Sequence, residues 1–238
     1  KAGTAITTGD QNTAVGHEAL KANTTATGNT AIGADALLSN VDGGNNTAVG
    51  LCSLRNNSTG GNNTAIGFRA GEDTTGGQNT ALGTCALFDN SSGDNNTAIG
   101  KEALANNTTA DNNTAVGNLA LLANTTGASN TAVGSGALNS LTTGFGNVGI
   151  GADSGAQGAM IDITGEDNRA VFGHNSITNA YVKVAFTVTS DQRDKMNISS
   201  VPHGLDFVNQ LKPVSFVFKK SRENATPHGP QKYGFKAQ

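Results

Sequence analysis

The sequence predicts a mainly β protein: a trimeric parallel β-solenoid, or β-roll, of 17-residue repeats, followed by a small α+β segment. Three observations predict this fold. A short unit, Asn-Thr-Ala-(Val/Ile/Leu)-Gly, recurs at a nearly constant spacing, the same residue types return at the same places in each copy, and the repeat stops well before the end of the chain. Repeated units of this size stack into a rod because each one buries its apolar residues against its neighbours.

The repeat occupies residues 12 to about 151. Numbered from its Asn, each copy has a branched aliphatic residue at position 4, Gly at position 5, Ala or Ser at position 8 and, in seven copies, Leu at position 9. The spacing is 17 residues, apart from one step of 16 between Asn63 and Asn79. The nine copies, of which the last is degenerate, begin at Asn12, Asn29, Asn46, Asn63, Asn79, Asn96, Asn113, Asn130 and Asn147.

Each unit contains two short apolar pieces, at positions 3–4 and 8–9. This pattern predicts two short strands and two turns per coil, with Asn and Thr side chains forming hydrogen-bonded ladders between coils. Successive coils are expected to rise by about 4.8 Å. The Gly at position 5 suits a turn that needs a positive φ, or a backbone too crowded for a Cβ.

Both residues of each apolar pair need burial, although neighbouring side chains of a strand point to opposite faces. Ala at positions 3 and 8 suits a thin interior, whereas the aliphatic residue at position 4 and the Leu at position 9 are expected to need another surface. A second copy of the chain supplies one, so we predict a homotrimer. The repeat resembles that of the β-roll heads of trimeric autotransporter adhesins, whose shorter repeats share an Asn-x-x-Ala-Ile-Gly pattern. A monomeric three-faced β-helix, whose usual coil length is close to this period, is the alternative.

Charge and hydrophobicity exclude several classes of function. The net charge is −3 and only 14% of residues are charged, whereas a nucleic-acid binder needs a basic patch. No apolar run is long enough to span a membrane and no signal peptide is present, so we expect neither a nucleic-acid partner nor membrane insertion. The chain begins at Lys1 without a Met, and we expect it to be a fragment of a longer protein.

Cys52 and Cys85 both occupy position 7 of their repeats, two coils apart. Their Cα atoms are expected to lie about 9.6 Å apart, beyond the limit of roughly 7 Å for a disulfide, so both are predicted to be free thiols. His203 and His228 lie in loop-like sequence with no metal ligand at a useful spacing. We therefore predict no metal site and no cofactor.

The chain divides into three predicted regions: a solenoid shaft over residues 1–158, a β-rich connector over 159–189, and a C-terminal segment over 190–238. Within the connector, Asn168–Gly173 echoes the repeat unit, and alternation between Tyr181 and Val188 predicts a strand.

In the C-terminal segment, Pro202 is expected to begin a helix that runs to about Gln210. Val214, Phe216 and Phe218 alternate as a further strand, and the residues from 219 to 232, which include two prolines, are predicted to form a loop.

A candidate reactive group follows the strand that ends at Val188. Ser190 precedes Asp191, Arg193 and Lys195. A Ser hydroxyl needs a base to take its proton before it becomes a good nucleophile, and a desolvated Lys can be that base. These residue types are common in polar turns, so the spacing alone is not specific.

The motifs around this group carry a second resemblance. Together they resemble the intramolecular chaperone domain of phage tail fibres and tailspikes, the self-cleaving peptidase S74 family typified by endosialidase tailspikes. The resemblance runs from about Val184 to Gln238. The motifs, in order, are Ser190-Asp191-x-Arg193-x-Lys195, Asn197-Ile198, Gly204-Leu205, Leu211-Lys212-Pro213-Val214-Ser215-Phe216 and Tyr233-Gly234-Phe235-Lys236-Ala237-Gln238.

This resemblance implies a role for the domain and for its residues. In that family the C-terminal domain drives trimerisation of the fibre and then cuts itself off before the Ser. Carried over, the bond between Thr189 and Ser190 is cut, Ser190 is the nucleophile, Lys195 is the general base, and Asp191 and Arg193 hold the turn. The family continues beyond the point where this sequence stops, so the domain is expected to be truncated.

Chain geometry limits how Ser190 and Lys195 can meet. Five extended residues span about 17 Å, which is too far for a hydrogen bond between the two side chains. The segment must therefore turn back on itself, or Lys195 must come from a neighbouring chain of the trimer.

The sequence thus predicts a structural, receptor-binding segment of a phage tail fibre, located on the virion or outside the cell. The expected partners are two further copies of the chain and a host-surface receptor, either a glycan or a protein. Any enzymatic act is limited to one self-cleavage. A bacterial surface adhesin or extracellular filament subunit with the same repeat and tail domain is the alternative. A glycan-degrading tailspike needs paired carboxylates, and the repeats carry only scattered ones, at Glu18, Asp35, Glu72 and Glu102.

Overall fold

The structure is a computed structural model that describes residues 1–158, 161–174, 176–178, 212–219 and 227–236. It divides into two compact units, Lys1–Tyr181 and Val182–Gln238. The described part of the chain contains no helix of the length and apolar character that crossing a membrane requires.

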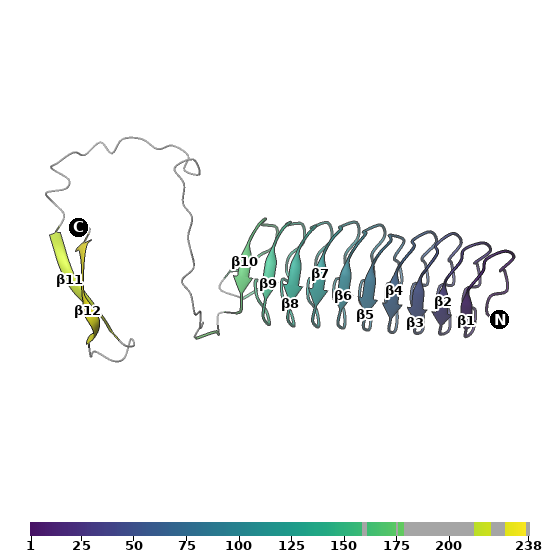
Figure 1. Ribbon diagram of the computed structural model, residues 1–238, viewed down its shortest axis with the longest axis horizontal. Helices are drawn as coiled ribbons and strands as arrows, with labels where there is room; N and C mark the ends of the chain where they lie inside the picture. Colours follow the sequence, from purple (N-terminus) through teal and green to yellow (C-terminus); the bar gives the residue numbers. More distant parts are fainter. Residues whose placement is uncertain (159–160, 175, 179–211, 220–226, 237–238) are drawn as a thin grey trace, which may run out of the picture. The chain divides into compact units, whose positions relative to one another are not determined.

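The first unit is a parallel β-solenoid, as the sequence predicts. Its coils each contribute one three-residue strand to a single ten-stranded sheet whose strand order follows the sequence (Figure 1). Equivalent residues pair in register, with Thr13 opposite Thr30 and Val15 opposite Ile32. The strands are β1 (Thr13–Val15), β2 (Thr30–Ile32), β3 (Thr47–Val49), β4 (Thr64–Ile66), β5 (Thr80–Leu82), β6 (Thr97–Ile99), β7 (Thr114–Val116), β8 (Thr131–Val133), β9 (Val148–Ile150) and β10 (Ala170–Phe172).

Strand β10 confirms that the segment from Asn168 to Gly173 continues the repeat. Ala170 pairs with Val148 and Phe172 with Ile150, so the ninth coil is longer than the others. Its added residues bring Ile163 into the core, where the side chain is fully buried. Ile163 fills the space beside Gly155, which stands where seven other coils carry Leu.

The Gly at position 5 meets both requirements that the sequence suggested. In Gly83, for example, φ is +138°, and an added Cβ would lie 2.6 Å from the carbonyl oxygen of Gly100 in the next coil. A side chain at this corner would therefore be strained and would also push neighbouring coils apart.

The prediction of a second strand in each coil is wrong. Positions 6 to 11 form turns in which positions 7 and 9 have positive φ, as in Glu18 (55°) and Leu20 (51°). Such residues break the two-residue alternation of a strand, so the side chains at positions 8 and 9 both point inward. Ala19 and Leu20 are each fully buried.

The expectation that the Leu at position 9 needs a partner surface is therefore wrong as well. All seven of these leucines are at most 1% exposed inside their own coils. Left-handed backbone costs a non-glycine residue about 1–2 kcal/mol, and burial of a Leu side chain contributes about 1.5–3 kcal/mol, which offsets that cost. The leucines are Leu20, Leu37, Leu54, Leu87, Leu104, Leu121 and Leu138.

Two asparagines hold the corners of a coil together from the inside in six of the nine coils. In the second coil, Asn29 and Asn40 both donate through Nδ2 to the carbonyl oxygen of Gly43, at 2.9 Å each. Asn29 Oδ1 also accepts the backbone N–H of Asn46 in the next coil, and Asn40 Nδ2 donates to Oδ1 of Asn23 in the preceding one. These buried amides satisfy backbone groups within a coil and link neighbouring coils, which confirms the predicted Asn ladders.

Hydroxyl groups at position 13 form a second ladder on the outside. Thr108 Oγ1 donates to the carbonyl oxygen of Thr125 at 2.9 Å, and Thr125 Oγ1 donates to that of Thr142 at 3.1 Å. The Thr residues therefore also bond from coil to coil, as the repeat predicts.

The second unit contains a two-stranded antiparallel sheet of β11 (Lys212–Lys219) and β12 (Pro227–Lys236). Strand β11 confirms the strand predicted from Val214 to Phe218. The predicted loop over residues 219–232 is wrong in part, because β12 begins at Pro227. Pro230 lies opposite an irregularity in the ladder between Phe216 and Phe218, which is where a strand tolerates a residue without an N–H.

Candidate functional site

An apolar stripe runs along the outer face of the solenoid sheet. It consists of the aliphatic side chains at position 4 of every coil, and it ends at Phe172, which is 68% exposed. The Ala at position 3 of β2 to β8 points inward and is at most 2% exposed, so position 4 must point out. The stripe comprises Val15, Ile32, Val49, Ile66, Leu82, Ile99, Val116, Val133, Ile150 and Phe172.

The chemistry of this face is uniform. No residue of strands β1 to β10 is charged, and position 2 is Thr in the first eight of them. A contiguous exposed apolar surface of this kind is a mark of an interaction site rather than of a solvated face. The alternation of Ala and the aliphatic residue predicts the members from Val15 to Ile150, whereas Phe172 lies beyond the predicted repeats.

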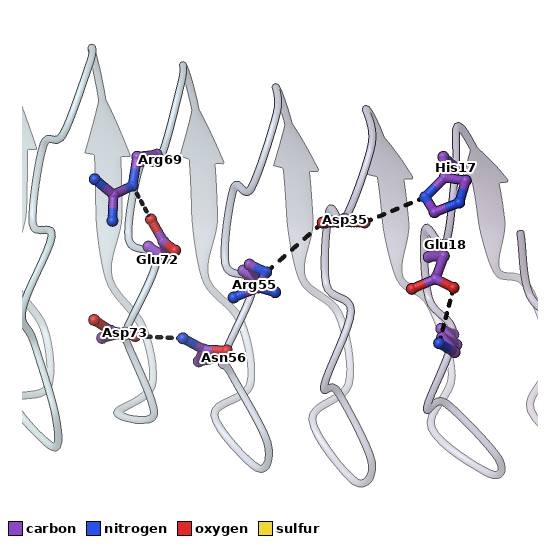
Figure 2. A network of polar contacts seen from close by, with 9 residues as sticks. His17, Glu18, Asp35, Arg55, Asn56, Arg69, Glu72 and Asp73 are labelled. Carbon is purple, nitrogen blue, oxygen red and sulfur yellow. Dashed lines mark hydrogen bonds and ion pairs between the residues drawn. The ribbon is translucent and has the colours of Figure 1, made fainter.

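The turn side of the coils carries the charges and varies from coil to coil. Figure 2 shows Arg69 paired with Glu72 and Asn56 hydrogen-bonded to Asp73. The guanidinium of Arg69 also lies 4.4 Å from the ring centre of Phe88. The hydrogen bond to Glu72 raises the pKa of Arg69. This face therefore offers different groups in each coil, whereas the stripe offers the same group throughout.

Both cysteines are free, as the sequence predicts. Burial raises the pKa of the Cys52 thiol, and the nearby carboxylates of Glu72 and Asp35 add to that effect. A raised pKa keeps the thiol protonated, so Cys52 lacks the thiolate that a nucleophile or redox centre needs.

A hollow of about 490 Å³ adjoins the last coils of the solenoid. Its walls include Ile161, Ile163, Glu166 and Arg169. Hydrogen bonds from the backbone N–H groups, that of Thr164 above all, lower the pKa of Glu166, so this wall offers a carboxylate as well as the guanidinium of Arg169. The sequence predicts the repeat-like segment Asn168–Gly173 on one side of this hollow but gives no periodic signal for the residues from Ile161 to Glu166.

The predicted catalytic residues Ser190, Asp191, Arg193 and Lys195, and the Thr189–Ser190 bond, lie outside the described residues. The predicted strand at 181–188 and the predicted helix at 202–210 also lie outside them. The roles of these residues therefore stay predictions.

Two of the motifs that carry the chaperone resemblance do meet in the structure. The Lys212–Phe216 part of the first lies in β11 and the Tyr233–Lys236 part of the second lies in β12. Pro213 pairs with Phe235 and Ser215 pairs with Tyr233, so the two motifs are neighbours in one antiparallel ladder. Residues about 20 positions apart in sequence thus form one local structure.

A comparison with known protein families also points to the chaperone domain. Residues 190–238, which are 49 of the 238 residues, match the Peptidase S74 family model, described as chaperone of endosialidase. The match confirms the resemblance that the motifs indicated. Searches of curated proteins and of solved structures each gave no match.

Proposed function

We propose that this chain, whose last 49 residues match the chaperone of endosialidase family, is a segment of a trimeric fibre that its C-terminal domain assembles. The observation that carries this proposal is the order of the parts. A rod with an unpaired apolar stripe along its sheet comes first, and a chaperone segment follows it. A rod that exposes such a stripe needs an assembly aid during folding, because free apolar strands aggregate.

The repeat itself supports a second copy of the chain as the partner. A partner that covers the whole stripe must present apolar groups at the same spacing along the rod. A parallel copy of the same solenoid meets this condition, and three copies around one axis cover every stripe at once. Stripes of three chains would then form a common apolar core.

We place this fibre in a phage tail, where it would act outside the cell and contact a host-surface glycan or protein. The family match supports the tail-fibre setting. The charged and varied turn side of the coils is the surface that we assign to the receptor, since the uniform stripe would be covered.

We further propose that the C-terminal domain cuts the bond between Thr189 and Ser190. Ser190 Oγ would attack the carbonyl carbon of Thr189 while Lys195 takes the hydroxyl proton. The C–N bond between Thr189 and Ser190 would then break as Lys195 returns the proton to the Ser190 nitrogen, and water would hydrolyse the resulting ester. Asp191 and Arg193 would hold the turn that brings these groups together. This is one self-cleavage and requires no external substrate.

The mass of the assembled chain tests the trimer. Ser190→Ala keeps every chain whole, and sedimentation equilibrium should then give three times 23.9 kDa. Adding Ile66→Lys and Leu82→Lys should lower the mass towards one chain at micromolar concentration, because burying unpaired ammonium groups costs several kcal/mol. Thr59→Lys and Thr109→Lys add the same charge on exposed turns and should leave the trimer intact. A monomer before any stripe substitution would overturn the proposal.

The mass of the denatured chain tests the self-cleavage. The unaltered chain should give two pieces that separate before Ser190, whereas Ser190→Ala and Lys195→Ala should each give one piece of 23.9 kDa. Ser199→Ala is a nearby control and should still be cut. Cleavage that persists in Ser190→Ala would remove Ser190 as the nucleophile.

A further inference from the structure

A cluster of three potential metal ligands lies on the turn side of the first two coils. It comprises His17 and Glu18, at positions 6 and 7 of the first coil, and Asp35, at position 7 of the second (Figure 2). One ligand atom from each residue lies within 4.8 Å of the other two. The sequence analysis predicted no metal site, because Asp35 stands 17 residues beyond Glu18 and only the solenoid stacks them.

The backbone fixes this arrangement. Glu18 and Asp35 have nearly the same φ, 55° and 57°, so their side chains leave successive coils in the same direction. The N–H of Asp35 donates to the carbonyl oxygen of His17 at 2.8 Å, which locks the two coils together beside the cluster. The ligands therefore come from a rigid part of the fold rather than from a free loop.

The two oxygens of Asp35 face different partners. Oδ2 lies 3.8 Å from Nε of Arg55, and Oδ1 lies 3.6 Å from Nδ1 of His17. Oδ1 is also buried and has no hydrogen-bond donor within the described residues. A buried carboxylate oxygen without a donor is costly, and a cation between it and the imidazole would satisfy it.

One oxygen of Glu18 is bonded to a neighbouring ammonium group. Glu18 Oε1 accepts a hydrogen bond from Lys21 Nζ at 2.8 Å. A carboxylate bonded through one oxygen can coordinate a metal through the other, and such outer contacts orient metal ligands. Each carboxylate thus has a cation beside it, Lys21 through a hydrogen bond to Glu18 and Arg55 through a longer ion pair with Asp35.

We propose that His17, Glu18 and Asp35 bind a divalent transition-metal ion of the Zn²⁺ class. Two atoms that are each about 2.1 Å from one tetrahedral ion lie about 3.4 Å apart, close to the His17–Asp35 distance of 3.6 Å. One imidazole and two carboxylates suit Zn²⁺ or Co²⁺, whereas Ca²⁺ and Mg²⁺ prefer oxygen ligands alone. Side-chain rotation of Glu18 and of the exposed His17 closes the remaining distance.

The ion would join the first coil to the second. A metal bridge at this place would add to the hydrogen bond between the Asp35 N–H and the His17 carbonyl oxygen, and would therefore oppose local opening between these two coils. This role is independent of the proposed fibre function, since it concerns contacts within one chain.

Cobalt titration of the full chain tests the site. After chelation, Co²⁺ should bind one ion per chain and give visible absorption without a thiolate charge-transfer band, because Cys52 and Cys85 take no part. His17→Gln should weaken binding at least about tenfold, as removal of an outer contact alone already costs that much. His174→Gln removes a half-buried His far along the chain from the cluster and should leave binding unchanged.

A thermal melt provides the second measurement. Co²⁺ should raise the Tm of the unaltered chain and of His174→Gln but not that of His17→Gln, and circular dichroism should show that all three are folded. The proposal is overturned if no Co²⁺ binds, or if His17→Gln binds it with the affinity and the spectrum of the unaltered chain.

Discussion

In seven of the nine coils, the strand side and the turn side carry the same kind of aliphatic residue in opposite surroundings. The fifth coil shows this most directly, because it has Leu at both places. Leu82, in strand β5, is 42% exposed, whereas Leu87, five residues later, is fully buried. The difference teaches that backbone conformation, and not residue type, decides which side chains make the core of the coil.

The two sides use hydrogen bonds between coils equally well. On the strand side, Gly83 N–H donates to the carbonyl oxygen of Ile66 at 2.9 Å, and on the turn side Leu87 N–H donates to that of Ala103 at 2.9 Å. Only the strand side keeps alternation, since Leu87 has a φ of 51°. The turn side therefore points two consecutive residues inward and leaves its charges outside.

The largest effect that we predict separates these two leucines. Leu87→Ala should lower the free energy of unfolding by about 2–5 kcal/mol, because it leaves a cavity in the coil. Leu82→Ala, which makes the same change on the exposed face, should cost less than about 1 kcal/mol at low protein concentration. Urea denaturation at several concentrations measures both, and a growing cost of Leu82→Ala with concentration would indicate assembly through the stripe.

Equal losses for the two variants in dilute solution would contradict the division into a buried and an exposed side. The exposed Leu is the matched control, because the two substitutions delete the same atoms from the same coil.

The second largest effect that we predict concerns the Gly at the corner between the strand side and the turn side. Gly83→Ala should lower the free energy of unfolding by about 2–4 kcal/mol, through a positive φ that Ala disfavours and through contact with the Gly100 carbonyl. Gly158→Ala is the control. Gly158 also has a positive φ, of 86°, but an added Cβ there meets no atom within 4 Å, so this variant should lose only about 1–2 kcal/mol. Similar losses in both would show that the corner is not crowded.

Sequence reasoning was correct wherever one strong rule acts alone. The repeat period predicts the stacked coils, and the alternation in Ala65-Ile66 predicts which side chain of each strand points inward. The prediction for position 9 was wrong because Ala86-Leu87 has the sequence pattern of a strand, whereas Leu87 adopts a left-handed backbone conformation. That conformation is unusual for Leu, and only the stacking of the preceding and following coils imposes it.

The candidate sites also differ in whether a single rule in the sequence predicts them. The apolar stripe was predicted from Val15 to Ile150 because these residues recur at an almost constant spacing. The cluster of His17, Glu18 and Asp35 was not, because its members are irregular within the repeat and meet only when two coils stack. The prediction that Ser190 and Lys195 act together rests on the order of the motifs, which the family match supports. The repeat period gives no information about these two residues.

The smallest effect that we predict is a gain of stability inside the turn side. The buried ladder of Asn23, Asn40 and Asn57 is interrupted at Thr74, and Asn57 Oδ1 is left buried without a donor. Thr74→Asn would place an amide at this position of the ladder. A new bond from Asn at position 74 to Asn57 Oδ1 should raise the free energy of unfolding by about 1 kcal/mol, measured by urea denaturation.

A double-mutant cycle distinguishes this bond from a general effect of the substitution. Introducing Thr74→Asn into an Asn57→Ala background removes the acceptor, so the gain should disappear there. An equal gain in both backgrounds would mean that the ladder bond is not formed. In that case the interruption of the ladder at the 16-residue step would reflect the shorter turn of that coil, and the Asn column would owe its stability to the carbonyl at position 15 rather than to contacts between successive amides.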